Sequence, residues 1–205
     1  MADLFQDKAA EWDTRPVPAQ ISEGVFNAIQ AHVPLSPELT VMDFGAGTGL
    51  IGGKLAPSVG RILAVDVSQA MLDQLAAKEA LKDKVSVRCQ DILQQPLDEQ
   101  VDLVVSAMAM HHVQDTAALL RALAEHLRPG GRVALADLDA EDGSFHPPGI
   151  EGVFHEGFDR DALGALMVQA GFEDVEFVTA TEVQKGDRSY PVFLVTANAP
   201  TRAAS

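Results

Sequence analysis

The chain has 205 residues, 47% of them hydrophobic, which is ordinary for one compact domain that buries its own core. It carries 15 Lys and Arg against 30 Asp and Glu, so its formal net charge is −15. So acidic a surface repels phosphate backbones, and we expect no nucleic-acid partner. No apolar run approaches the length of a membrane-spanning helix, so no membrane partner is expected either.

Two further features bear on location and on metal binding. Residues 1–13 hold four acids and one Lys before any apolar run, so we predict no secretion signal and a cytoplasmic protein. Cys89 is the only cysteine, which excludes a disulfide framework and a cysteine-based zinc site. No other metal site is expected.

Short β-branched runs alternate along the chain with segments of helical periodicity. Apolar residues at four-residue spacing between Ile21 and Val33 predict a first helix that ends before Pro34. The alternation that follows is typical of βαβ units and of a mainly parallel sheet covered on both faces. The expected strands are residues 39–44, 61–66, 84–89, 101–107, 132–138, 175–183 and 190–197.

Polar residues precede three of the predicted helices. Ser68, Asp115 and Asp159 each stand before apolar residues at helical spacing and are expected to cap those helices. The helix after Asp115 is expected to include Leu127 and to stop at the Pro-Gly-Gly of residues 129–131.

The end of the chain predicts an antiparallel pair. The last helix is expected to end at Gly171. Residues 184–187 then join the last two strands in a loop short enough for a hairpin. Residues 199–205 are expected to form a frayed tail.

Three alternate glycines, Gly45, Gly47 and Gly49, follow the first predicted strand and open a helix. Side chains at these positions would block a ligand lying against the backbone, and the helix start offers free N–H groups. A structural turn without a ligand is the alternative, but three glycines there lower helix stability without a packing reason. The loop therefore indicates a ligand site.

The same loop also fits a dinucleotide-binding pattern. Gly47 to Gly52 reads G-x-G-x-x-G, and Asp66 lies 19 residues beyond Gly47, where a ribose-binding acid belongs. A nicotinamide-dependent oxidoreductase is therefore an open alternative. It is disfavoured because no hydride-transfer constellation is evident, since Tyr190 is the only tyrosine and sits in a terminal strand.

The order of five motifs separates these alternatives. Between about residues 5 and 197 the chain resembles the class I S-adenosylmethionine-dependent methyltransferases, and within them the small-molecule group of ubiquinone- and menaquinone-biosynthesis type (methyltransferase types 11 and 12). The resemblance implies a Rossmann-like single α/β domain with a seven-stranded, mainly parallel sheet and an antiparallel last strand. The matching motifs are DFGAGTG at 43–49, VDVS at 65–68, QDI at 90–92, VDLVVS at 101–106 and LRPGG at 127–131.

The resemblance also implies S-adenosylmethionine as cofactor and a role for each matched residue. The acid and glycines of the first motif would surround the methionine part of the cofactor, and Asp66 would accept hydrogen bonds from both ribose hydroxyls. Met71 would pack on the adenine, although core packing is an equal alternative, and Asp91 would accept from its amino group unless it is a turn residue. The full implied set is Asp43, Gly45, Gly47, Gly49, Asp66, Val67, Met71, Asp91, Ile92 and Ser106.

Histidines mark the expected reaction end of the site. His111 and His112 directly follow the fourth strand, whose carboxyl end faces ligands in open α/β sheets, and histidine is the usual base at neutral pH. For both, a structural role as a wall or an anchor is favoured. His155 is a third candidate, which the adjacent Glu156 could orient. Metal binding there is not expected, because the second histidine of H-E-x-x-H is missing.

Residues 137–161 contain eight acids and one base, Arg160. Such a segment is usually a solvated loop, but if it lines the pocket it disfavours strongly anionic acceptors. Its apolar residues suit a small, partly hydrophobic acceptor. A leader or lid is expected at 1–36, where Phe5 and Trp12 could close over the cofactor, with the methyltransferase domain at 37–198. A catalytically silent cofactor-binding domain is the rival from another class.

Overall fold

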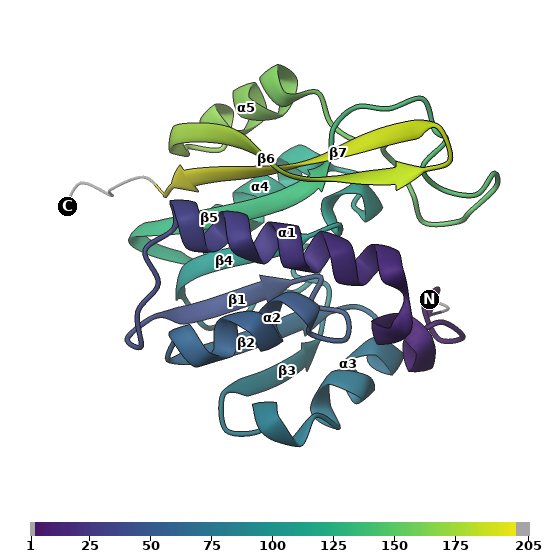
Figure 1. The fold of residues 1–205 in the computed structure, drawn as a ribbon. Coiled ribbons are helices and arrows are strands. Elements are labelled where there is room, and N and C mark those ends of the chain that lie inside the picture. The colour runs from purple at the N-terminus through teal and green to yellow at the C-terminus, as the bar shows by residue number, and fades with distance from the viewer. Residues whose placement is uncertain (1–2, 200–205) are drawn as a thin grey trace.

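A computed structural model describes residues 3–199 and shows a seven-stranded sheet with helices on both faces (Figure 1). The strand order is β3-β2-β1-β4-β5-β7-β6. Neighbouring strands are parallel from β3 to β5, whereas β7 is antiparallel to β5 and β6. The predicted fold class is confirmed. The strands are β1 Thr40–Phe44, β2 Arg61–Asp66, β3 Val85–Cys89, β4 Val101–Ala107, β5 Leu127–Leu138, β6 Glu173–Lys185 and β7 Arg188–Asn198.

The α-helices are α1 Pro16–His32, α2 Leu50–Leu55, α3 Gln69–Ala76, α4 Thr116–Glu125 and α5 Arg160–Gln169. The three predicted caps are confirmed, because Ser68 Oγ, Asp115 Oδ1 and Asp159 Oδ1 each accept an N–H from the first turn of the helix that follows, at 3.2, 2.8 and 2.9 Å. Short 3-10 turns lie at Ala9–Thr14, Ala56–Ser58, Glu79–Leu81 and Met110–His112. Among residues 3–199, no helix is both long and apolar enough to cross a membrane.

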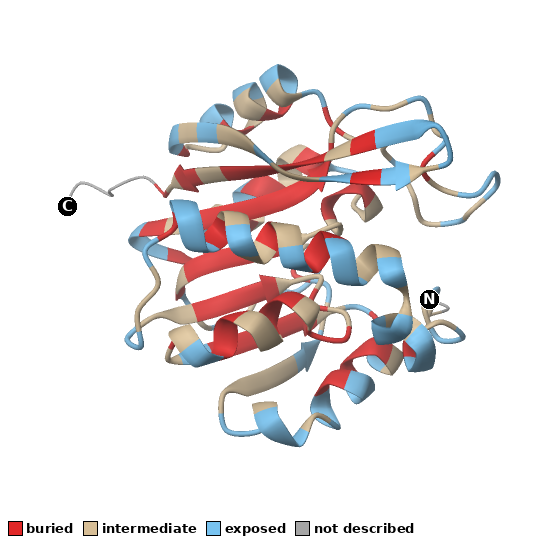
Figure 2. Ribbon diagram, in the orientation of Figure 1, coloured by how far each residue is buried: buried red, intermediate tan, exposed pale blue. Residues whose placement is uncertain are grey.

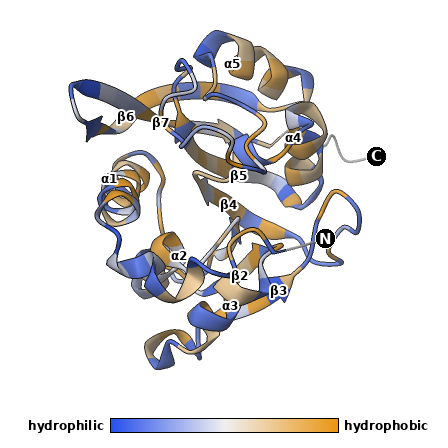
Figure 3. Ribbon diagram, turned by 90° about the vertical axis from the view of Figure 1, so that its right-hand side faces the viewer, coloured by the Kyte–Doolittle hydropathy of each residue, from blue (hydrophilic) through white to orange (hydrophobic). Residues whose placement is uncertain are grey.

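Side chains of the central strands alternate between two cores, as the pleat of a strand requires. Val41 and Leu103 pack against α1 and α2, whereas Met42 and Val104 pack with α4 and α5. Figure 3 shows these two helix pairs on opposite sides of the strands, and Figure 2 shows the central strands buried. Burial on both faces explains why these strands read as continuous apolar runs in the sequence.

The first helix packs against the last hairpin of the chain. Gly24 of α1 lies so close to β6 that a Cβ on it would stand 2.5 Å from the Thr181 Cβ. Gln20 Nε2 donates a hydrogen bond of 2.9 Å to the carbonyl of Glu182. α1 therefore joins the antiparallel end of the sheet to the core formed with α2.

The expected end of the fourth helix is wrong. α4 ends at Glu125, and Leu127 is instead the first residue of β5, paired with Val101. The Pro-Gly-Gly segment lies inside this strand, where the register shifts and Gly130 takes a φ of 74°. The local sequence allows Leu127 to end a helix or to begin a strand. Its pairing with β4 decides for the strand.

Two predictions for the end of the chain are refined. The last two strands extend to Lys185 and Arg188, so a two-residue turn replaces the expected four-residue loop, with Gly186 at a φ of 59°. Of the expected frayed tail, Ala199 is buried, and its N–H donates to the Gly131 carbonyl at 2.7 Å. The rest, 200–205, lies outside the described residues.

Candidate functional site

β1 lies between β2 and β4, so the chain order reverses beside β1. Open α/β sheets bind ligands outside the carboxyl ends of the strands at such a point. The loops after β1, β2 and β4 contain the glycines, Asp66 and the paired histidines that the sequence indicated. The topology therefore brings the predicted cofactor-binding residues and the candidate catalytic histidines to the same edge of the sheet.

The three loop glycines have different local reasons to be glycine. Gly45, Gly47 and Gly49 all have left-handed conformations, with φ of 67°, 53° and 81°. A Cβ on Gly45 would overlap Ala109, and a Cβ on Gly49 would overlap Leu75. A Cβ on Gly47 would meet nothing within 4 Å. Packing explains the first and third glycines, whereas the second borders open space.

Asp43 is buried at the end of β1. Its Oδ2 accepts a hydrogen bond of 3.0 Å from the N–H of Gly52 in α2, so the carboxyl ties the strand to the helix. Burial raises the pKa of Asp43 to about 7, although the Gly52 hydrogen bond opposes this rise; the nearby charge of Asp66 adds to it. Asp43 is therefore only partly ionised at neutral pH.

Binding of S-adenosylhomocysteine is expected to strengthen roughly tenfold from pH 6 to pH 8. The ammonium group of this ligand favours an ionised Asp43, and protonation of a carboxyl with a pKa of about 7 competes with it as the pH falls. Calorimetric titration at pH 6, 7 and 8 measures the effect. Asp43→Asn should bind more weakly and lose the pH dependence; an unchanged dependence in that variant would contradict the assignment.

Asp66 connects the glycine loop to the start of α3. Its Oδ2 accepts the Gly47 N–H at 2.8 Å, and its Oδ1 accepts the Ser68 N–H at 2.8 Å. Burial raises the pKa of Asp66, while these hydrogen bonds lower it. The carboxylate thus has a fixed orientation at the carboxyl end of β2, next to the open space at Gly47.

The other residues of the predicted cofactor set lie in contrasting surroundings. Val67 is 66% exposed, an unusual state for a branched apolar side chain, while Met71 and Ile92 are buried. Asp91 is exposed, and its Oδ1 accepts the Leu93 N–H at 2.9 Å, as a turn residue does. Ser106 is fully buried in β4, and its hydroxyl has no hydrogen-bond partner among residues 3–199.

The N-terminal segment contacts three parts of this region. Asp3 Oδ2 accepts hydrogen bonds from Ser68 Oγ and from the Ala70 N–H at 2.9 and 3.1 Å. Asp13 bonds to the Thr48 hydroxyl and pairs with Lys78 at 2.6 Å. Phe5 packs edge-on against both Trp12 and His112, with ring centroids 5.8 and 5.5 Å apart. This part of the leader therefore lies along the predicted cofactor loops.

His111 has a buried carboxylate partner that the sequence analysis did not identify. Its Nδ1 lies 2.7 Å from Asp137 Oδ1, and its backbone N–H donates to Asp137 Oδ2 at 3.1 Å. The His111 and Asp137 side chains are 1% and 0% exposed. His111 Nε2 is buried without a partner in the described part of the chain. This contact gives His111 an orienting partner that was not evident in the sequence.

Two further histidines surround His111. The His112 ring centroid lies 4.1 Å from that of His111, and the His146 centroid lies 5.0 Å from it. Burial, together with repulsion from a positive charge on His111, lowers the pKa of His112 and of His146 to about 4. Both neighbours are therefore neutral at pH 7. His112 Nδ1 donates to the Gly152 carbonyl at 2.6 Å, which fits the favoured structural role.

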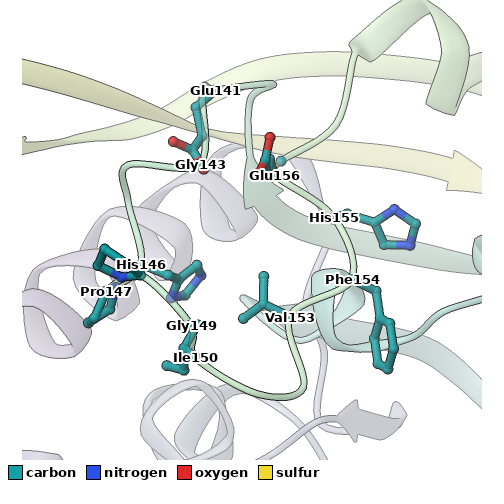
Figure 4. Close-up of a pocket in the computed structure, with 12 residues that line it drawn as sticks. Glu141, Gly143, His146, Pro147, Gly149, Ile150, Val153, Phe154, His155 and Glu156 are labelled. Atoms are coloured by element: carbon teal, nitrogen blue, oxygen red, sulfur yellow. The ribbon is translucent and has the colours of Figure 1, made fainter.

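The expected pairing of His155 with Glu156 is wrong. His155 Nε2 lies 2.9 Å from the Val113 carbonyl and 3.2 Å from Thr116 Oγ1. Glu156 instead lies against Gly143, and Figure 4 shows the two side chains pointing apart. His155 thus fastens its loop to the segment after β4.

The acids of residues 137–161 mostly have structural partners. Asp139 forms a two-point ion pair with Arg160 at 2.7 and 2.8 Å, and Asp142 pairs with Arg188. Glu141 Oε2 accepts backbone N–H groups of the next turn at 2.8 and 3.1 Å. Asp137 is buried, as described above. The segment is therefore a loop whose carboxylates help to fix its shape, while five of its acids are exposed, as the solvated-loop alternative expects: Asp142, Glu151, Glu156, Asp159 and Asp161.

Residues 141–157 of the same loop line a cavity of about 540 Å³ that is open to solvent (Figure 4). Its lining residues include Glu141, Glu156, His146, Val153 and Phe154. The described lining contains no Lys or Arg. The cavity has the volume of a small-molecule site.

Comparison with known proteins identifies the domain. Residues 41–131 match the family described as "Methyltransferase domain". An uncharacterised methyltransferase of Schizosaccharomyces pombe is 32% identical over 68% of this chain and 55% of its own length. The chain spans about half the length of this and other curated relatives. A ubiquinone/menaquinone biosynthesis C-methyltransferase of Shewanella frigidimarina is 25% identical over 89% of this chain and 86% of that protein.

A solved structure has the same fold. The N-methyltransferase of Bradyrhizobium japonicum, in complex with S-adenosyl-L-homocysteine, aligns with a TM-score of 0.72 at 20% identity over 97% of this chain and 95% of that one. The sheet order and this alignment show a Rossmann-like fold shared with S-adenosylmethionine-dependent methyltransferases. Residues 41–131 match the methyltransferase-domain family, and the resemblance to this class of enzyme seen in the sequence is confirmed.

Proposed function

We propose that the whole protein transfers the methyl group of S-adenosylmethionine to a small-molecule acceptor. The match of residues 41–131 to a methyltransferase domain carries this proposal. The local geometry supports it, because the open space beside Gly47 adjoins the fixed carboxylate of Asp66 and the exposed side chain of Val67. These features suit a ligand with hydroxyl donors and a flat apolar face.

The residues present fit the cofactor at both ends. Asp43 and the loop of Gly45 to Gly49 would hold the methionine part, and Asp66 would accept the ribose hydroxyls. Val67 and Ile92 would flank the adenine, and the unpartnered hydroxyl of Ser106 is available to a ligand atom. When bound, the cofactor supplies an electrophilic methyl group, so the chain has mainly to position a nucleophile in line with the S–CH₃ bond.

The remaining roles complete the proposal. For Met71 and Asp91, both a contact with the adenine and a purely structural role stay open. Met71 is buried in the core, and Asp91 forms a turn. Residues 1–36 would act as a leader whose Phe5 and Trp12 close over the bound cofactor. The acceptor would be neutral or cationic, because the net charge of −15 disfavours nucleic acid and strongly anionic ligands. We also propose a cytoplasmic location, which the acidic composition favours.

Calorimetry with three ligands tests the cofactor assignment. S-adenosylmethionine and S-adenosylhomocysteine should bind, whereas NADH should give no response. Tight NADH binding without a response to either sulfur nucleoside would favour the nicotinamide-dependent oxidoreductase. Binding of both nucleosides, but no transfer of a labelled methyl group to any metabolite in a small-molecule pool, would favour the catalytically silent cofactor-binding domain.

A further inference from the structure

We infer that the cavity inside residues 141–157 is the acceptor site and that His111, held by Asp137, accepts a proton from the acceptor atom that is methylated. This inference rests on the proposed function and narrows its substrate class. The acceptor would be neutral or cationic and would carry a hydroxyl, a thiol or a protonated amine as its nucleophile. Asp137 would be a positioning residue, because it acts through His111.

The arrangement of the buried pair favours proton acceptance at a single nitrogen. Asp137 Oδ1 lies 2.7 Å from His111 Nδ1 and also accepts the Leu138 N–H at 2.8 Å, while Asp137 Oδ2 accepts the His111 N–H. These contacts fix the carboxylate and place the ring proton on Nδ1. Nε2 then keeps its lone pair, and it has no partner in the described part of the chain.

Burial of an unpaired ring nitrogen is costly unless a ligand or water uses it. His126 provides the contrast, because it is buried too, yet its Nε2 accepts the Leu97 N–H at 2.9 Å and its Nδ1 donates to the Ala122 carbonyl at 2.6 Å. The fold therefore satisfies both nitrogens of one buried histidine and leaves one nitrogen of His111 free. This difference points to a ligand at His111.

The turn that carries His111 also contacts the cofactor loop. Ala109 packs directly on Gly45, and Met108 before it has a left-handed φ of 59°. A methionine in that conformation is strained, and such strain collects at functional sites. The Met108 N–H donates to the Ala136 carbonyl of β5 at 2.9 Å, which fastens the turn beside Asp137. The turn thus contacts the glycine loop through Ala109 and Asp137 through His111.

The cavity adjoins the same turn. His146 lines the cavity, and its ring centroid is 5.0 Å from that of His111. The N–H of Phe154, another lining residue, donates to the His111 carbonyl at 2.9 Å, and the Gly152 carbonyl accepts from His112. The loop around the cavity is therefore hydrogen-bonded to the histidine turn at two points, both within residues 152–154. With Glu141 and Glu156 in the lining, an anionic acceptor is disfavoured.

The proposed step balances without a further reagent. A lone pair of the acceptor atom forms the bond to the methyl carbon, and the S–CH₃ bond breaks with its electrons going to sulfur. The proton of a hydroxyl or thiol passes to His111 Nε2 as this bond forms, whereas a protonated amine passes its proton to Nε2 first and attacks with the lone pair thus freed. In both cases Asp137 stabilises the resulting imidazolium. His111 then releases this proton to solvent. Neutral acceptor plus sulfonium becomes methylated acceptor, neutral thioether and one proton.

A spectroscopic measurement tests the arrangement without an acceptor. In protein labelled with ¹⁵N-histidine and saturated with S-adenosylhomocysteine, long-range ¹H–¹⁵N spectra should show His111 protonated on Nδ1 and not on Nε2. His111→Gln removes and so assigns the signal, and Asp137→Asn should change the tautomer. An Nε2-protonated ring in the wild type, or a tautomer unaffected by Asp137→Asn, would overturn the inference.

Methylation of defined probes tests the substrate class. One set bears a proton on the nucleophile (phenol, catechol, benzylamine, benzyl mercaptan), and the other does not (pyridine, N,N-dimethylaniline, thioanisole). With labelled S-adenosylmethionine, we expect product from the first set only. His111→Gln should lower that rate about 10²–10⁴-fold and Asp137→Asn at least about tenfold. The matched variant His126→Gln, which alters a buried histidine away from the site, should keep the rate.

Each other outcome counts against the inference. Methylation of the proton-free set, a rate unchanged in His111→Gln, or no product from any probe with the wild type would overturn it. Loss of rate in His126→Gln as well would assign the effect to general destabilisation. Calorimetry on the same samples separates this result from failure of the proposed function, because absent binding of S-adenosylhomocysteine would reject the methyltransferase proposal itself.

Discussion

Gly47→Val is expected to weaken binding of S-adenosylhomocysteine at least about hundredfold, or about 3 kcal/mol. A Cβ on residue 47 would have no other protein atom within 4 Å, and it would lie in open space beside the carboxylate of Asp66. A branched side chain there would displace the nucleoside from the loop whose backbone it should contact. Calorimetric titration of the variant against the wild type gives the loss.

The matched control for this substitution is Gly130→Val. Gly130 also has a left-handed φ, 74° against 53° for Gly47, and a Cβ on it would also meet nothing within 4 Å. Both variants therefore pay a similar backbone strain of about 1–3 kcal/mol, visible as a lower Tm. Only Gly47→Val should lose the ligand. Equal affinities in the two variants would show that the nucleoside does not lie at Gly47.

Asp66→Ala should cost about 1.5–3 kcal/mol of binding free energy, or about 10–150-fold in Kd. The carboxylate is the expected acceptor for both ribose hydroxyls, and a charged hydrogen bond contributes on that scale. The structure adds a second cause, because the substitution also frees the N–H groups of Gly47 and Ser68 that now fix the loop. Calorimetry with S-adenosylhomocysteine measures the loss.

Asp102→Ala separates these effects from ordinary loss of a structural carboxylate. Asp102 accepts the Thr40 N–H at 2.8 Å and pairs with Arg128 at 2.6 Å, at the opposite end of the parallel strands. This control should lower the Tm and leave the affinity unchanged. If Asp66→Ala bound the nucleoside as tightly as Asp102→Ala, the ribose assignment would be wrong.

Local patterns were sufficient for most of the fold. Apolar periodicity and the polar caps Ser68, Asp115 and Asp159 depend on neighbours within one turn of helix, so the sequence alone predicts them. Leu127 shows the limit of prediction from local patterns. It lies in a strand because it pairs with Val101, and no pattern of neighbouring residues contains that pairing.

The candidate site divides in the same way. The glycine loop and Asp66 form one continuous strand-turn-helix unit followed by the next strand, and could be predicted from spacing. The pair of His111 and Asp137 joins residues 26 positions apart in different elements, so its geometry depends on the pairing of β4 with β5. One signal was available: Asp137 is the only charged residue in the otherwise apolar stretch 133–138 of its predicted strand, and a buried charge requires a partner.

The contact of α1 with the last hairpin has a consequence for how the chain is completed during synthesis. Gly24 and Gln20 meet residues 181 and 182, so the apolar face of α1 gains this cover only after nearly the whole chain has been made. Contacts between such distant segments form late, because long loops must close first. During synthesis the apolar face of α1 therefore stays exposed until the final hairpin has been made. We expect a chain truncated before that hairpin to bind chaperones.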